Sequence, residues 1–134
     1  MKPRNWVILA AVAALTACAA MKNRETDEQT LARYMDYAGE PVDSFSYLGR
    51  FDGWRSLGRD RVVVWTGVND AYLLTVQQPC QDLQFAQRIG VTSTGSTVSR
   101  GFDSVKVGNN QTCRITEIRP VNYKDLKAAE KAGG

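Results

Sequence analysis

Apolar residues spaced three and four positions apart predict a helix over residues 26–38. This spacing is the period of an amphipathic helix with one apolar stripe. The stripe consists of Leu31, Tyr34, Met35 and Ala38. Thr26 and Gln29 form a capping-box pattern at the start of the helix, and Gly39 followed by Pro41 marks its end. We expect the stripe to pack against a sheet rather than against a partner protein.

Two β-rich runs separated by a short polar segment predict a central hairpin. Residues 61–66 and 71–76 are rich in β-branched and aromatic side chains, and residues 67–70 contain Gly, Asn and Asp, which are turn residues. The first run holds the three consecutive valines 62–64. Because it is apolar on both faces, we expect it to be an interior strand that is covered on both sides.

The second half of the chain predicts further antiparallel strands. Residues 88–92 are one strand, and Val98 begins the strand that returns from the following turn. Val105 and Val107 face the same side as Cys113 and Ile115. We expect a five-residue loop that pairs Val107 with Cys113 and Val105 with Ile115, because this register buries all four side chains.

Two segments complete the expected fold. Residues 81–87 fit either a helical turn or a strand, whereas Asn122, with Asp125 three residues later, is typical of the start of a last helix. The predicted fold class is mainly β (α+β): an antiparallel sheet, small barrel or sandwich with an N-terminal and a C-terminal helix. Residues 26–134 then form a single domain, since no linker divides them.

The first eighteen residues have the layout of an export signal. Lys2 and Arg4 precede an apolar run over residues 6–14, which is too short to span a bilayer of about 30 Å. Leu15-Thr16-Ala17-Cys18 resembles the bacterial lipobox, and this resemblance implies that Cys18 becomes the lipid-bearing first residue of the mature protein. An ordinary secretory signal, cut after small residues, is the alternative.

The lipobox resemblance defines the expected organisation and location. Residues 1–17 are then a lipoprotein signal peptide, and residues 18–25 are a tether with a reach of roughly 15 Å if it is a flexible coil. The membrane becomes a partner through the anchor at Cys18. Ala19 resembles the residue that directs such proteins to the outer membrane. We therefore expect a protein anchored in the bacterial envelope, on the periplasmic face of the outer membrane.

Charge and composition exclude several function classes. The net charge is +3, of which Lys2 and Arg4 supply two units, so the mature chain is close to neutral and is not expected to bind nucleic acid. The chain has no histidine, which excludes Ser-His-Asp and Cys-His nucleophilic sites and zinc sites that use histidine. We expect no cofactor, no metal site and no enzymatic activity.

Apart from Cys18, the chain has two cysteines, Cys80 and Cys113. In an exported domain of this size, an even pair of cysteines most often forms a disulfide bond. Neither cysteine has the partners that a catalytic or metal-binding role needs. The sequence therefore predicts a Cys80–Cys113 disulfide.

Arginines interleaved with aromatic residues form one candidate binding face. Its members are Arg50, Phe51, Trp54, Arg55 and Arg59. Such a mixture can bind a phosphate, a glycan or another protein. The alternative is a solvated strand face on which the arginine stems cover the aromatics. We favour this alternative and keep the binding face as a hypothesis.

From Tyr47 to Pro120 the chain resembles an uncharacterised family of small Gram-negative lipoproteins, classified only as a domain of unknown function. The resemblance is carried by residues 60–66, 71–74, Cys80 with Leu83, residues 101–103 and residues 113–115. It implies no activity. Our first hypothesis is a binding or inhibitory module for an envelope protein or glycan. The alternatives are a structural lipoprotein that docks onto a larger assembly and, more weakly, a glycan hydrolase that uses two carboxylates.

Overall fold

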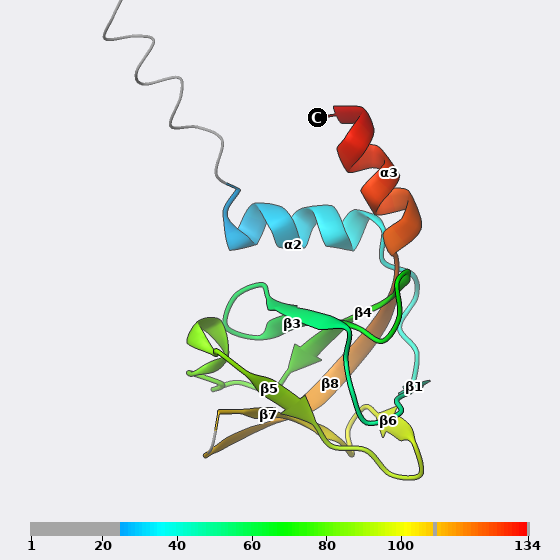
Figure 1. The fold of residues 1–134 in the computed structure, drawn as a ribbon. Helices are drawn as coiled ribbons and strands as arrows, with labels where there is room; N and C mark the ends of the chain where they lie inside the picture. Colours follow the sequence, from blue (N-terminus) through cyan, green and yellow to red (C-terminus); the bar gives the residue numbers. More distant parts are fainter. Residues whose placement is uncertain (1–24, 109, 134) are drawn as a thin grey trace, which may run out of the picture.

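A six-stranded antiparallel sheet curls around one hydrophobic core (Figure 1). The computed structural model describes residues 25–108 and 110–133. The strand order is β2-β3-β4-β8-β7-β5. The bounds are β2 Gly53–Ser56, β3 Arg61–Trp65, β4 Asp70–Val76, β5 Ile89–Val91, β7 Ser104–Val107 and β8 Gln111–Asn122.

A two-stranded sheet and three short helical segments surround the large sheet. These elements are β1 Ser44–Ser46, β6 Thr97–Ser99, α2 Asp27–Asp36, α3 Tyr123–Gly133 and the 3-10 turn η2 Leu83–Phe85. The predicted class, mainly β with an early and a late helix, is confirmed. Within the two described ranges, no helix has the length and apolar character needed to cross a bilayer.

Helix α2 starts at the predicted capping box. The Thr26 hydroxyl accepts a hydrogen bond from the Gln29 amide at 3.1 Å, and the Gln29 side chain accepts one from the Thr26 amide at 3.0 Å. The helix ends at Asp36, two residues earlier than predicted. Tyr34 is buried against the sheet, whereas Met35, at the edge of the stripe, is 39% exposed.

The central hairpin has the predicted strands, and β3 is buried on both faces. Val62 and Val64 lie in the inner core that the curled sheet encloses. Val63 points the other way, into an outer core beneath α2 and α3. The expectation that this strand is covered twice is therefore confirmed, and the two covering layers are the rest of the curled sheet and the helices.

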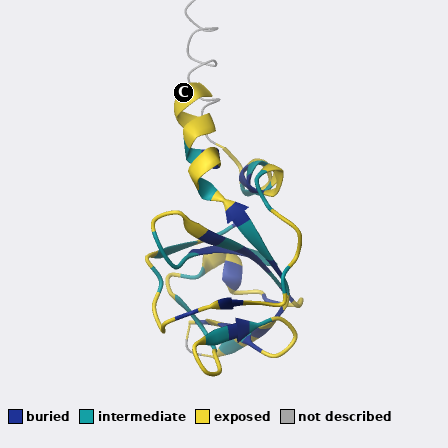
Figure 2. Ribbon diagram, turned by 90° about the vertical axis from the view of Figure 1, so that its right-hand side faces the viewer, coloured by how far each residue is buried: buried dark blue, intermediate teal, exposed yellow. Residues whose placement is uncertain are grey.

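Aromatic rings fill part of the outer core. The Trp65 ring packs edge-on against the rings of Tyr34 and Tyr123, with centroids 6.3 and 5.3 Å away. Burial raises the pKa of Tyr34, and the charges of Tyr123 and Glu130 raise it further, while two nearby arginines act in the opposite direction. The far end of α3 projects from the body and is exposed (Figure 2).

Strand β8 is long enough to serve both halves of the sheet. Residues 111–114 pair with β7, and the section that ends at Asn122 pairs with β4, with a bulge opposite Thr75 and Val76. Pro120 lies inside this strand, and its carbonyl accepts a hydrogen bond from Gly39. In a β-strand, the nitrogen and oxygen of one residue point to the same side. The proline nitrogen therefore faces the side of β8 on which Gly39 lies, and not β4.

The predicted register between β7 and β8 is wrong by two residues. Val105 pairs with Cys113, and Val107 pairs with Gln111. The connection is therefore shorter than predicted, and it begins at Gly108 with φ at +58°, a conformation that glycine adopts without strain. A shift of two residues keeps every side chain on its original face, so the predicted set of buried residues is still correct.

The strand that begins near Val98 does not pair with the strand that precedes it in the chain. It forms β6 and pairs with β1, placing Val98 opposite Phe45. Strand β5 pairs instead with β7. This small β1–β6 sheet contributes Phe45 and Val98 to the inner core.

A buried carboxylate fixes the turn between β6 and β7. Asp103 is 2% exposed and accepts hydrogen bonds from the Thr92 hydroxyl and the Ser99 amide, both at 2.8 Å. By contrast, the Asp43 carboxylate pairs with Arg100 nearby on the surface, at 2.9 Å. Hydrogen bonds to a buried charged group stabilise a fold more than an exposed ion pair does.

We predict that Asp103→Ala lowers the free energy of unfolding by about 2–4 kcal/mol, because two partly buried donors lose their acceptor. The matched variant Asp43→Ala should lower it by less than about 1 kcal/mol. Urea unfolding of the full chain, with Cys18 replaced by serine to keep it free of lipid, measures both values. Equal losses for the two variants would contradict the structural role of Asp103.

Candidate functional site

The curled sheet has an open side between its two edge strands, β2 and β5. The turn η2 lies there, in contact with β2. Leu83 is fully buried in the inner core and holds the turn in place. The residues on either side of Leu83 are exposed, so the same turn closes the core and presents side chains to solvent.

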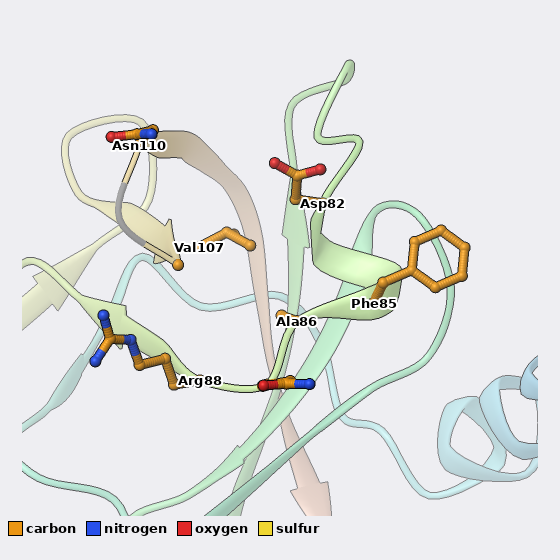
Figure 3. A pocket seen from close by; sticks show the side chains of 8 residues that line it. Asp82, Phe85, Ala86, Arg88, Val107 and Asn110 are labelled. Atoms are coloured by element: carbon orange, nitrogen blue, oxygen red, sulfur yellow. The ribbon is translucent and has the colours of Figure 1, made fainter.

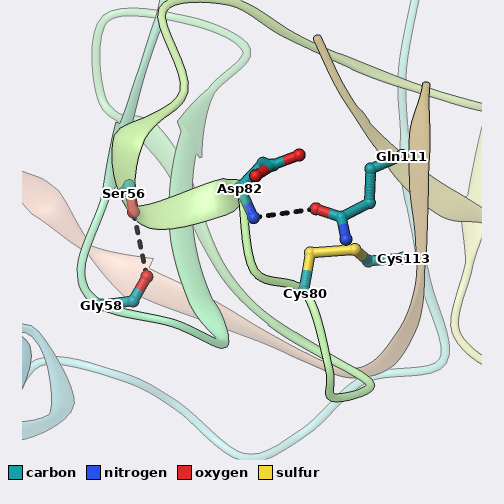
Figure 4. The surroundings of a disulfide bond; sticks show 6 residues. All are labelled: Ser56, Gly58, Cys80, Asp82, Gln111 and Cys113. Atoms are coloured by element: carbon teal, nitrogen blue, oxygen red, sulfur yellow. Dashed lines mark hydrogen bonds between the residues drawn. A yellow bond between two sulfur atoms is a disulfide. The ribbon is translucent and has the colours of Figure 1, made fainter. Parts of the chain in front are cut away.

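One disulfide bond and one hydrogen bond hold this turn in place. Cys80 and Cys113 form the predicted disulfide, with Cα atoms 5.9 Å apart, and both residues are buried. The Asp82 amide donates a hydrogen bond to Gln111 Oε1 at 2.9 Å, beside the disulfide (Figure 4). Both contacts join the turn to β8, the strand that is shared by the two halves of the sheet.

The exposed side of the turn is unusual in composition. Phe85 is 78% exposed, although Leu83, two residues earlier, is fully buried. Five glutamines occupy positions 77, 78, 81, 84 and 87, and all five are exposed. We refer to residues 77–87 as the glutamine turn.

Three adjoining hollows follow the glutamine turn. One of about 730 Å³ lies between Phe85 and Arg88 and reaches Asn110. The second, of about 390 Å³, shares Phe85 with the first and reaches Arg59. The third, of about 710 Å³, shares Arg59 with the second and extends to the start of α2. In Figure 3 the Phe85 ring projects outward from the turn, on the side away from Arg88 and Asn110, which line the other side of the first hollow.

The five residues of the sequence-predicted binding face do not form one surface. Trp54 and Phe51 pack against the inner core, and Phe51 lies 5.0 Å from the Tyr47 ring centre. Arg55 is the next residue after Trp54 on β2, so it points to the opposite face, where its guanidinium contacts Thr30 at 3.5 Å. Arg50 and Arg59 lie beyond opposite ends of β2 and are exposed, and Arg59 lines two of the hollows.

A second depression lies on the helix side of the sheet. It measures about 430 Å³ and is lined in part by Trp54, Trp65, Val68 and Tyr123. Among the described residues, the Trp65 ring nitrogen is buried without a hydrogen-bond partner. Trp54, Trp65 and Tyr123 are each only partly exposed, whereas Phe85 is 78% exposed, so each ring of this depression offers a ligand less free surface than Phe85 does.

Several of the carboxylates that a hydrolase would need have structural partners. Asp60 pairs with Arg61 at 2.7 Å, and Glu117 pairs with Arg119 at 2.9 Å. Asp103 is held by Thr92 and Ser99, as described above. In the part of the chain that the structure describes, no three His, Cys, Asp or Glu residues are grouped so as to hold a metal ion.

Comparison with known protein families gives one match. A family of unknown function, DUF6491, matches residues 1–134. The chain belongs to this family. No curated protein and no solved structure matches this DUF6491 chain.

Sequence reasoning about this DUF6491 protein missed the glutamine turn. The available signal was the density of glutamines around Cys80 and Phe85, in the run Gln77-Gln78-Pro79-Cys80-Gln81-Asp82-Leu83-Gln84-Phe85-Ala86-Gln87. An apolar Phe at that position is as compatible with a core strand as with an exposed turn. Only the inward position of Leu83 decides that Phe85 points outward.

We predict that the Cys80→Ala/Cys113→Ala variant loses roughly 4 kcal/mol of stability in the chain-entropy model, given a separation of 33 residues. Urea unfolding of the full chain with Cys18→Ser measures the loss. Thiol labelling of the denatured, unreduced protein should find neither Cys80 nor Cys113 free. Two reactive thiols would contradict the disulfide in the purified protein.

Proposed function

We propose that this DUF6491 protein is a lipid-anchored module of the bacterial envelope that binds a partner through the glutamine turn. The observation that carries the proposal is Phe85, which is exposed on a turn fixed by a disulfide and a buried leucine. A rigid aromatic side chain at such a position contributes contact area to a complex with little loss of side-chain entropy. Two exposed arginines, Arg59 and Arg88, flank the same hollows.

The anchoring part of the proposal comes from the N-terminal sequence. Cys18 and the segment that resembles a lipobox lie outside the described residues. Only Glu25 of the predicted tether is described, and its carboxylate pairs with Arg33 at 2.6 Å. Asp27, at the start of α2, lines the third hollow. A partner in these hollows would therefore lie close to the point where the anchored segment joins the domain.

Binding is a better match to the chemistry of the site than catalysis. The chain has no histidine, and the glutamine turn supplies neutral amides, which do not transfer protons near pH 7. Asp82 is the single carboxylate of the turn, and its side chain is exposed. A single carboxylate does not supply the pair of acid and base that glycoside hydrolysis uses.

We predict that Cys18→Ser abolishes membrane attachment. The sulfur of Cys18 is the atom that the lipid would be joined to, and the remaining chain has no described helix that could span a bilayer. Fractionation of cells followed by mass spectrometry of the mature N-terminus measures the effect. A Cys18→Ser protein that is processed at the same site and stays in the membrane fraction would refute the anchor.

We predict that a photo-crosslinking residue at Gln84 captures a partner in intact envelopes, and that Phe85→Ala reduces this adduct at least fivefold. Gln77 provides the matched control, since it is exposed but lines none of the three hollows. Phe102→Ala is the matched aromatic control, because Phe102 is 67% exposed and belongs to a different turn. Equal adducts from positions 77 and 84, or an adduct insensitive to Phe85→Ala, would contradict the proposal.

A further inference from the structure

We infer that the ligand of the glutamine turn is a neutral glycan chain. This inference rests on the proposed binding role of the turn and adds the chemical class of the partner.

The lining groups match sugar hydroxyls. A side-chain amide both donates and accepts hydrogen bonds, as a hydroxyl group does. Gln78, Gln81 and Gln84 line the second hollow, and Gln87 with Asn110 lines the first. Amides therefore recur along the whole path, so that one sugar unit after another can be bonded in the same way.

Phe85 supplies the flat surface that such a chain needs. The face of an aromatic ring carries partial negative charge, which attracts the polarised C–H groups on the face of a pyranose ring. Phe85 lines both the first and the second hollow, so its ring lies where the two meet. A sugar stacked there would have amide groups on either side.

Charge and hydrophobicity disfavour other ligand classes. Asp82 and Arg88 share the first hollow, and Arg59 shares the third with Asp27, Glu28 and Asp60, of which Asp60 pairs with Arg61. Because a cationic and an anionic side chain occur in both hollows, a polyanion is not complementary to the path, and a polycation would meet an excess of opposite charge only in the third hollow. The apolar lining is limited to separate side chains such as Ala86, Val107 and Leu57, which is too little to bury an acyl chain.

A peptide ligand is disfavoured by the closure of the sheet. Peptides commonly add a strand to a free sheet edge and place alternate side chains in pockets. Here the open side between β2 and β5 already holds η2, whose Leu83 fills the inner core. The groups that η2 presents to solvent are the Gln84 amide and the Phe85 ring.

The test is binding of the full chain, purified from membranes in detergent, to N-acetylglucosamine hexamer and to purified peptidoglycan sacculi. Calorimetry measures the dissociation constant for the hexamer, and co-sedimentation measures retention on sacculi. We expect both probes to bind, with Phe85→Ala weakening the hexamer affinity at least tenfold and Gln84→Ala at least threefold. Gln77→Ala and Phe102→Ala should change the affinity by less than twofold. All four side chains are exposed, so the unfolding midpoints should stay unchanged.

Two further measurements separate the glycan from other ligands. Raising NaCl from 50 to 500 mM should leave the affinity for the uncharged hexamer within twofold, since screening acts on charge pairs. Co-sedimentation with insoluble chitin, an uncharged glycan that carries no peptides, should match that with sacculi. Salt-sensitive binding, or binding to sacculi but not to chitin, would overturn the glycan assignment.

The outcomes also distinguish this inference from the proposed function. If neither glycan probe binds but Gln84 still gives an adduct that depends on Phe85, the glycan class is wrong and the binding role stands. If the hexamer binds equally well to wild type and Phe85→Ala, the glutamine turn is not its site. If neither the adduct nor glycan binding depends on Phe85, both proposals fail.

Discussion

The pairing of β8 with two different neighbours is the constraint on which the rest of the fold depends. One end of this strand pairs with β7 and the other with β4, and a bulge lies near the start of the section that pairs with β4, between Ile115 and Glu117. A bulge increases the local twist and bends the strand, so the two halves of the sheet curve toward each other instead of lying flat. The inner core, which includes Ile115 and Ile118 on either side of the bulge, is the space that this bend encloses. The edge strands β2 and β5 are left as the open side.

Closure of that open side connects the fold with the candidate site. A barrel would close it by hydrogen bonds between the edge strands, but here a short turn closes it with one buried leucine and a disulfide to β8. The backbone of such a turn can be rigid while its side chains stay free, because the fixing contacts are made by Leu83, Cys80 and the Asp82 amide. Phe85 and the glutamines are not needed for packing, and so they are available for recognition. Sites held by rigid supporting contacts lose less entropy on binding than mobile ones.

Features set by neighbouring residues were predictable from the sequence, whereas features set by distant contacts were not. The Thr26–Gln29 capping box, the hairpin turn after Trp65 and the double burial of the valines 62–64 each follow from a short pattern. The register of β7 and β8 has two solutions that bury the same side chains, and the choice depends on turn geometry at Gly108. The proposed face around Trp54 and Arg55 failed to assemble because the strand alternates between them. The glutamine turn was overlooked since its outward direction depends on where Leu83 packs.

A weak glycan site would suit a protein that is held near a membrane. Each amide–hydroxyl bond replaces a bond to water and contributes little net free energy, and one aromatic ring adds only a modest amount. Such a site binds a free sugar poorly. If the lipid at Cys18 holds the domain beside a glycan layer, however, the local ligand concentration reaches roughly the millimolar range and each contact becomes effectively intramolecular. A tether of about eight residues, as the sequence predicts, would limit the reach to roughly 15 Å and would favour glycan chains that lie close to the membrane surface. Anchor and turn would then act together, with membrane attachment supplying the concentration and the Phe85 surface supplying the selectivity.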